Sequence, residues 1–283
     1  MNTFKTTLLL TGMTLLFLFV GGAIGGRGGM TLALVIAIGM NAFTYFFSHK
    51  IALAMSHAQP VTREQAPRLY RITEALVQRA GLPMPKLYVM PEAAPNAFAT
   101  GRSPSNAAVA VTVGLLETMD DEELAGVIAH ELGHVRNYDI LTGSIAATLA
   151  GAITYLAQMG HFAMLFGGSH RSDDDEGSNP LVALLMILVA PIAATIVQLA
   201  ISRQREYAAD ATAARIVGHP FGLMRALEKL GAYNKRIPMH ASPATSSLFI
   251  VAPFSAGGFA NLFSTHPPLE SRIAALRTLS MAA

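Results

Sequence analysis

Hydrophobic residues are gathered in four long runs that divide the chain. The runs extend over residues 7–24, 30–47, 141–166 and 180–201, and none contains an Asp, Glu, Lys or Arg. Each run is close to the length of about 20 residues that a helix needs to cross the hydrocarbon core of a bilayer. The pattern therefore predicts four transmembrane helices arranged as two hairpins.

The composition agrees with a membrane protein. Hydrophobic residues make up 52% of the chain, charged residues only 13%, and the mean hydropathy is +0.42, all far from an ordinary soluble domain. A cleavable signal peptide is an alternative for the first run, and burial in a soluble core is an alternative for the second. No small-x-small cleavage site follows the first run, however, and the second begins after the short glycine-rich segment 25–29, so a hairpin is the simpler interpretation.

The distribution of basic residues predicts the orientation in the membrane. The segments inside the two hairpins contain only Arg27 and, at residues 167–179, Arg171 with four acidic residues. Basic residues such as Lys5, Lys50 and Arg203 flank the other ends of the runs. Because Lys and Arg favour the cytoplasmic side, we expect both termini and most of the polar chain to be cytoplasmic.

The polar part before the third run is expected to form an α+β unit. Residues 62–65 match a capping box that would open an amphipathic helix ending at Gly81. Residues 86–90 and 107–113 are typical of strands, with a short strand at 96–100 between them. The predicted small sheet has an edge to which an extended peptide could add by main-chain hydrogen bonds.

A candidate metal site lies in the sequence His130-Glu131-Leu132-Gly133-His134. On a helix, two histidines four residues apart face the same side. This H-E-x-x-H arrangement is typical of a catalytic zinc site, in which the histidines hold the metal and the glutamate acts on a water molecule. Residues 120–123 match a capping box at the start of such a helix, so we predict zinc ligation by His130 and His134 and catalysis by Glu131.

The third zinc ligand is predicted downstream, where Glu206 and Asp210 are again four residues apart. Glu206 would complete a set of two histidines and one glutamate with an open fourth position for water. Asp210 is expected to accept the free N–H of a zinc-bound histidine, His130 in particular. The alternative is that Asp210 simply pairs with Arg205 or Arg215.

Two further residues are candidates for contact with substrate. Asn96 lies in the short predicted strand and either touches the substrate or caps a turn. His266 precedes two prolines at the start of the last predicted helix, 268–281, and either donates to the developing oxyanion or caps that helix. Another helix is predicted at 220–233, and the segment 237–264 is rich in Ser, Ala, Gly and Pro, which is typical of a loop.

Four sequence strings occur in order along the chain: NAFATG at 96–101, HELGHVRN at 130–137, SRQREYAAD at 202–210 and STHPP at 264–268. Together they resemble the HtpX family of membrane proteases, which is related to the CAAX prenyl proteases, over essentially the whole chain. The resemblance implies a bacterial inner-membrane zinc endopeptidase of protein quality control that acts on misfolded or damaged membrane proteins at the cytoplasmic face. It also implies that His130, His134 and Glu206 hold one Zn²⁺ per chain and that Glu131 is the catalytic glutamate.

The resulting prediction is a mainly α protein with four transmembrane helices and a cytoplasmic zincin-like α+β metalloprotease domain. We divide it into a first membrane hairpin (1–50), a zincin part (51–140), a second hairpin (141–201) and a cytoplasmic part with the third ligand (202–283). The predicted partners are damaged membrane proteins and the lipid bilayer. No nucleic-acid motif is present, and the sequence does not indicate an oligomeric state.

Two other functions are considered. An intramembrane protease of the site-two type would bury its H-E-x-x-H motif within a span, whereas charged residues flank this motif on both sides. A non-catalytic zinc-binding scaffold or holdase would need a fourth protein ligand, and the absence of cysteine removes the commonest one.

Overall fold

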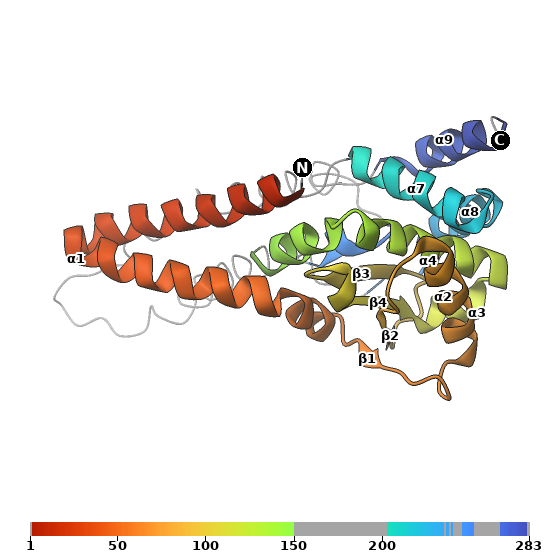
Figure 1. Ribbon diagram of the computed structural model, residues 1–283, viewed down its shortest axis with the longest axis horizontal. Helices are drawn as coiled ribbons and strands as arrows, with labels where there is room; N and C mark the ends of the chain where they lie inside the picture. The colour runs from red at the N-terminus through yellow and green to blue at the C-terminus, as the bar shows by residue number, and fades with distance from the viewer. Residues whose placement is uncertain are drawn as a thin grey trace.

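The computed structural model describes residues 2–149, 203–234, 236–237, 239, 245–251 and 267–281. A long helical hairpin projects from a compact part that contains a small sheet and several helices (Figure 1). Most of the predicted second hairpin and His266 lie outside the described residues. The boundaries of the four predicted parts therefore stay a prediction.

Helix α1 (Asn2–Met55) forms the hairpin. It breaks at Gly25 and Gly26, and the positive φ of 56° at Gly26 explains why glycine stands at the turn. The two arms run back along each other (Figure 1), and the Asn41 side chain donates to the Thr14 hydroxyl at 2.8 Å across them. The predicted helical hairpin is therefore present, whereas the crossing of a membrane by both arms stays a prediction.

The described helices differ in whether they are long and apolar enough to cross a bilayer. Among the described residues, the segment Gly25–Met55 is the one helix long and apolar enough to cross a bilayer, while Thr6–Phe19 and Asp139–Leu149 are apolar but shorter. The third predicted run is described only as far as Leu149, and the fourth lies outside the described residues. The four-span arrangement is thus not established and stays a prediction.

The sheet has four strands in the order β1-β2-β4-β3. These strands are β1 (Gln59–Pro60), β2 (Lys86–Met90), β3 (Ala97–Gly101) and β4 (Ala107–Thr112). Strand β2 is parallel to β4, and β3 is antiparallel to β4 with Ala99 opposite Val109. All three predicted strands are confirmed to within a residue, and β3 lies at one edge.

Helix α2 (Pro67–Ala80) starts four residues later than the capping box at 62–65 predicts. The Thr62 amide does donate to Gln65 Oε1, at 2.9 Å, but within a turn. Proline disfavours helical backbone in the residue before it, and Ala66 accordingly has φ −136°. Pro67 is therefore the first helical residue, where its missing N–H costs no hydrogen bond. The predicted end at Gly81 is confirmed.

Helix α4 (Asp121–Arg136) packs against α2 and β3 and against two helices from later in the chain. Its predicted capping box is present, because the Glu123 amide donates to Asp120 Oδ1 and the Asp120 amide to Glu123 Oε2, both at 2.9 Å. The core of the compact part gathers around α4 and includes the fully buried Leu124, Val127 and Ile128. The other described helical elements are α3 (Val113–Thr118), α7 (Arg203–Val217), α8 (Phe221–Asn234), α9 (Leu269–Met281) and the short 3₁₀ turns η1 (Pro104–Asn106) and η3 (Ser246–Leu248). Of these, α7 and α8 pack against α4, and α9 packs against α7 and α8.

Helix α7 approaches α4 closely at a glycine. A Cβ atom on Gly133 would lie 3.1 Å from the Ala209 Cα, so a larger residue there would force the two helices apart. This contact between small residues brings the motif on α4 next to the one on α7.

After α4, the chain turns at Tyr138 (φ 58°) into the helix Asp139–Leu149. This helix contacts the membrane hairpin, since the Thr142 and Thr6 hydroxyls are 3.0 Å apart and Ile145 and Leu149 pack against Met13. A short turn thus connects the helix that bears the H-E-x-x-H motif to an apolar helix that packs against the hairpin.

Candidate metal centre

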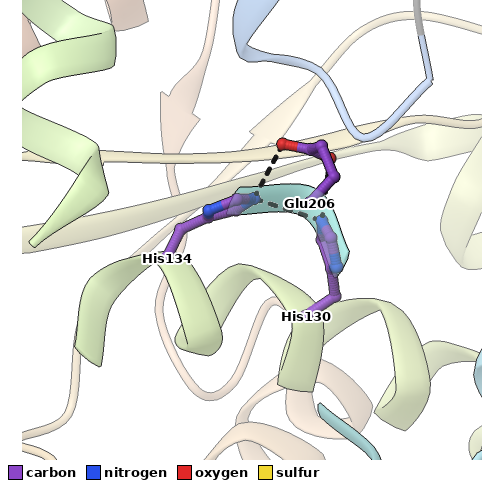
Figure 2. A group of neighbouring side chains, drawn as sticks. All are labelled: His130, His134 and Glu206. Atoms are coloured by element: carbon purple, nitrogen blue, oxygen red, sulfur yellow. Dashed lines mark hydrogen bonds and ion pairs between the residues drawn. The ribbon is translucent and has the colours of Figure 1, made fainter. Parts of the chain in front are cut away.

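Three side chains from two helices meet at the candidate metal site (Figure 2). His130 and His134 project from α4 and Glu206 from α7. The two Nε2 atoms are 3.2 Å apart, and the Glu206 carboxylate oxygens lie 3.5 Å from His134 Nε2 and 3.7 Å from His130 Nε2. One potential ligand atom from each residue lies within 4.8 Å of the others. Two imidazole nitrogens and one carboxylate are a donor set that suits a metal such as zinc.

Glu131 lines a small cavity beside these side chains. The cavity has a volume of about 40 Å³ and is also lined by His134, Glu206 and Ala99 of the edge strand. Both Glu131 carboxylate oxygens are buried, and neither makes a hydrogen bond of good geometry among the described residues. Burial raises the pKa of Glu131 to about 7; the His134 ring opposes this rise and the Glu206 carboxylate adds to it. A buried carboxyl group of this kind is well suited to accept a proton near neutral pH.

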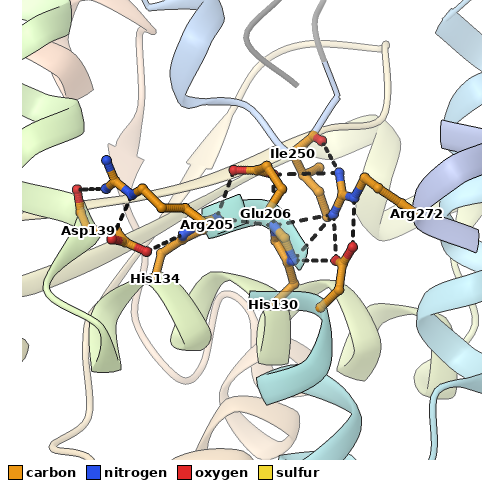
Figure 3. Close-up of polar contacts among 8 residues, drawn as sticks. His130, His134, Asp139, Arg205, Glu206, Ile250 and Arg272 are labelled. Atoms are coloured by element: carbon orange, nitrogen blue, oxygen red, sulfur yellow. Dashed lines mark hydrogen bonds and ion pairs between the residues drawn. The ribbon is translucent and has the colours of Figure 1, made fainter. Parts of the chain in front are cut away.

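Asp210 lies behind His130, as the sequence predicts. Its Oδ1 is 2.8 Å from His130 Nδ1, which leaves Nε2 directed at the site. The proposed alternative, pairing with Arg205 or Arg215, is not what the structure has. The arginine that binds Asp210 is Arg272 of α9, through Nε at 2.9 Å and Nη2 at 2.7 Å (Figure 3).

Arg272 is a residue that sequence reasoning misses. Its side chain is completely buried. Besides its two bonds to Asp210 it donates from Nη1 to the Ile250 carbonyl at 2.9 Å, and its Nη1 is 3.7 Å from Glu206 Oε2. The guanidinium thus connects α9 with both α7 and the 245–251 segment, directly behind the candidate ligands.

His134 is held by a second acid that sequence reasoning also misses. Asp139 Oδ2 is 3.1 Å from His134 Nδ1, and Asp139 Oδ1 is 2.7 Å from Arg205 Nε. Arg205 also donates to the Asp139 carbonyl at 2.7 Å (Figure 3). Each histidine therefore has its own carboxylate on Nδ1, and each carboxylate has its own arginine.

Asp139→Asn is expected to weaken zinc binding about 10- to 100-fold, because a carboxylate on the outer ring nitrogen orients a ligand histidine and increases its basicity. Titration of the purified protein against a zinc chelator of known affinity would measure the effect. Asp121→Asn, at an exposed acid near the start of α4, is the matched control. An Asp139→Asn protein with the zinc affinity of Asp121→Asn would show that Asp139 does not position His134.

The surroundings shift the pKa values of the two histidines in opposite directions. Burial lowers the pKa of His130 to about 4, assisted by the nearby Arg272 charge. Burial also acts to lower the pKa of His134, but the carboxylates of Glu206 and Asp139 outweigh it and raise that pKa above 6.5. Without metal, His130 is therefore neutral at neutral pH, whereas His134 holds a proton more readily than a free imidazole does.

Zinc affinity is accordingly expected to fall as the pH decreases through the raised pKa of His134. Below that pKa zinc must displace the His134 proton, which weakens binding by about tenfold per pH unit; above it this dependence disappears. His130 does not make the zinc affinity depend on pH near neutrality, since its pKa is far lower. Chelator competition between about pH 6 and pH 8 tests this, and a zinc affinity that did not change over that range would contradict it.

The remaining candidates lie apart from the ligand cluster or outside the described part of the chain. Asn96 is buried, and its amide nitrogen donates to the Val251 carbonyl at 2.9 Å. This bond holds a neighbouring segment at the edge of the sheet, and contact of Asn96 with substrate stays a prediction. His266 is outside the described residues, so its role as an oxyanion donor or helix cap stays a prediction.

These features together define a class of protein. A helix with H-E-x-x-H, a carboxylate from a second helix, a buried glutamate in a cavity beside an edge strand, and a long apolar hairpin are the parts of a membrane metallopeptidase. The comparisons with known proteins agree: the sequence profile of peptidase family M48 matches residues 63–280. The chain belongs to peptidase family M48 and, within it, to the HtpX proteases.

Several curated relatives support this assignment. A protease HtpX homolog from Desulfatibacillum aliphaticivorans is 57% identical over 275 residues, covering 97% of this chain and 89% of the relative. One from Thermodesulfovibrio yellowstonii is 53% identical over 280 residues, covering 99% of each chain. Among solved structures, S. mikatae Ste24p is similar in fold, with a TM-score of 0.53 and 20% identity; the match covers 97% of this chain and 64% of that protein.

Proposed function

We propose that this protein is a zinc endopeptidase that cleaves misfolded or damaged membrane proteins at the cytoplasmic face of a bacterial inner membrane. The observation that carries the proposal is the buried Glu131 carboxylate beside the His130, His134 and Glu206 cluster. Membership of a metallopeptidase family supplies the reaction class, while the metal, substrate and orientation are proposals.

His130, His134 and Glu206 would hold the zinc ion, which when bound supplies a Lewis acid that polarises the scissile carbonyl and lowers the pKa of a water molecule. Glu131 accepts the proton of the attacking water on a carboxylate oxygen and then donates it to the leaving amine nitrogen. Its pKa of about 7 without metal suits both transfers. The carboxylates of Asp210 and Asp139 keep the two imidazoles oriented throughout. Hydrolysis proceeds without a covalent enzyme intermediate.

The position of the site relative to the apolar segments supports a location near the membrane surface. His130 and His134 precede the segment 141–201 and Glu206 follows it, so two crossings by that segment would return the chain to the same side. The helix Asp139–Leu149 contacts the membrane hairpin within a few residues of His134. A site so close to the bilayer would meet polypeptides as they emerge from it, which fits damaged membrane proteins as substrates.

A zinc add-back experiment tests the proposed function. The full-length protein is purified in detergent with a chelator, and cleavage of a destabilised membrane protein is measured before and after one equivalent of zinc. We expect cleavage only after zinc is added. The same treatment of His130→Ala serves as the control, since it lacks a ligand. If zinc is bound but neither a membrane protein nor an unfolded soluble protein is cleaved, the proposal is wrong and the scaffold alternative gains support.

A further inference from the structure

Residues 245–251, which we call the inner strap, lie along the free edge of β3. The Ile250 amide donates to the Ala97 carbonyl at 3.0 Å. The Asn96 side chain bonds both backbone groups of Val251. It donates to the Val251 carbonyl at 2.9 Å and accepts from the Val251 amide at 3.4 Å. These bonds fix the strap to the start of the edge strand.

The edge that the strap occupies is the one a further strand would use. The Asn96 carbonyl accepts from the Thr112 amide at 3.0 Å and therefore faces β4. Because successive carbonyls along a strand alternate in direction, those of Ala97 and Ala99 face away from β4. The Ala97 carbonyl accepts a hydrogen bond from Ile250 of the strap. Ala99 lines the cavity together with Glu131.

The strap side chains pack into two hydrophobic clusters: Leu248 and Phe249 belong to one, and Ile250 and Val251 to the other. Phe249 is buried in one cluster with Phe98, the two rings meeting edge to face with centroids 5.2 Å apart. Ile250 is buried in the opposite cluster, together with Ala97. The strap thus fills an aromatic position beside Phe98 and an aliphatic position beside Ala97, the two side-chain positions that a peptide added to this edge would also reach.

The strap also closes the catalytic cavity. Residues 247–250 form one of its walls, opposite Glu131, and Arg272 holds this wall through its bond to the Ile250 carbonyl. A cavity of about 40 Å³ has room for a few water molecules but not for a peptide. A peptide that added to this edge would compete with the strap for the Ala97 carbonyl.

We propose that the inner strap occupies the position of the substrate, and that an extended peptide with a large apolar side chain displaces it from β3. This inference rests on the proposed function. It identifies the preferred ligand as a strand-forming segment with an aromatic or bulky aliphatic residue for the Phe98 pocket. Such segments are buried in folded proteins and become available when a substrate unfolds, which gives the enzyme a physical basis for selecting damaged chains.

A reversible cross-link between strap and strand tests the proposal. The chain has no cysteine, so Ala97→Cys with Ile250→Cys introduces one defined thiol pair, at two positions joined by a backbone hydrogen bond. We expect oxidation of the zinc-loaded double variant in detergent to decrease cleavage on the order of tenfold or more, because the binding-competent fraction falls. A phosphine reductant should restore the activity. The two single variants, treated in the same way, control for effects of the oxidant.

The outcomes separate this inference from the proposed function. If the reduced, zinc-loaded double variant and the wild type both fail to cleave, the proposed function itself is wrong. If the reduced and cross-linked forms of the double variant cleave at the same rate, the proteolytic function stands and the strap proposal is overturned. Failure of the cross-link to form also overturns it, because the proposal requires Ile250 beside Ala97.

A peptide competition experiment on the wild-type enzyme gives an independent result. The peptide Thr-Ser-Ser-Leu-Phe-Ile-Val reproduces the strap. We expect it to compete with substrate, raising KM without changing kcat, whereas the same peptide with Phe249→Asp should lose most of this effect because a carboxylate is costly to bury beside Phe98. Equal inhibition by both peptides, or by neither, would contradict selection by the aromatic pocket.

Discussion

Glu131→Gln is expected to decrease peptide cleavage by about 10²- to 10⁴-fold, the usual contribution of a general base, while zinc remains bound. Glutamine has nearly the same shape but cannot accept the proton of the attacking water. The three candidate ligands are untouched by the change, and removing a carboxylate from this buried cavity does not leave a charge unpaired. Parallel measurement of zinc content and of the initial cleavage rate would test this prediction.

Two control variants make that result specific. Glu117→Gln changes an exposed carboxylate on α3 and should cleave like the wild type. Glu206→Ala should lose both zinc and cleavage, because it removes a candidate ligand. A Glu131→Gln protein that retained an appreciable fraction of the wild-type rate would remove Glu131 from the mechanism, whatever its zinc content.

Arg272→Leu is expected to produce the largest loss of stability among single changes behind the site, about 3–5 kcal/mol, because it leaves the buried Asp210 without its cationic partner. Burial opposes the charge of Asp210, yet the Arg272 guanidinium keeps the pKa of this carboxyl below its ordinary value. Without the arginine, the Asp210 carboxylate either stays buried and unpaired or takes up a proton. In the second case it orients His130 less well.

Thermal unfolding and zinc titration of the variant would measure both consequences. We expect a lower unfolding temperature together with weaker zinc binding. The matched control is Arg277→Leu, which removes an exposed arginine from the same helix and should change neither property appreciably. If Arg272→Leu unfolded at the temperature of Arg277→Leu, the buried network around Asp210 would contribute little to the fold.

Local sequence signals were sufficient for the elements that present the candidate ligands. The capping box at Asp120 and Glu123 and the four-residue spacing of His130 and His134 are both short-range features, and the structure has both. The start of α2 was mispredicted because the preference of the residue before Pro67 outweighed a matching capping pattern at 62–65.

The residues that support the ligands could not be predicted in the same way. Arg272 meets Asp210 across 62 positions of sequence, and only the packing of α9 against α7 brings them together. Asp139 reaches His134 because the chain turns at Tyr138, whose positive φ has no strong sequence signal. The bond between Asp210 and His130 is predictable, because a metal-ligating histidine usually donates its second ring N–H to an acceptor. The arginine partner of Asp210 is not predictable in this way.

The most direct test of the account is a crystal structure of the zinc-loaded Glu131→Gln protein, with anomalous diffraction recorded at the zinc edge. The account predicts one zinc peak per chain, about 2.0–2.2 Å from nitrogens of His130 and His134 and from an oxygen of Glu206, with no fourth ligand from the protein. A zinc ion bound elsewhere, or held at this site by a fourth protein side chain, would contradict a catalytic centre.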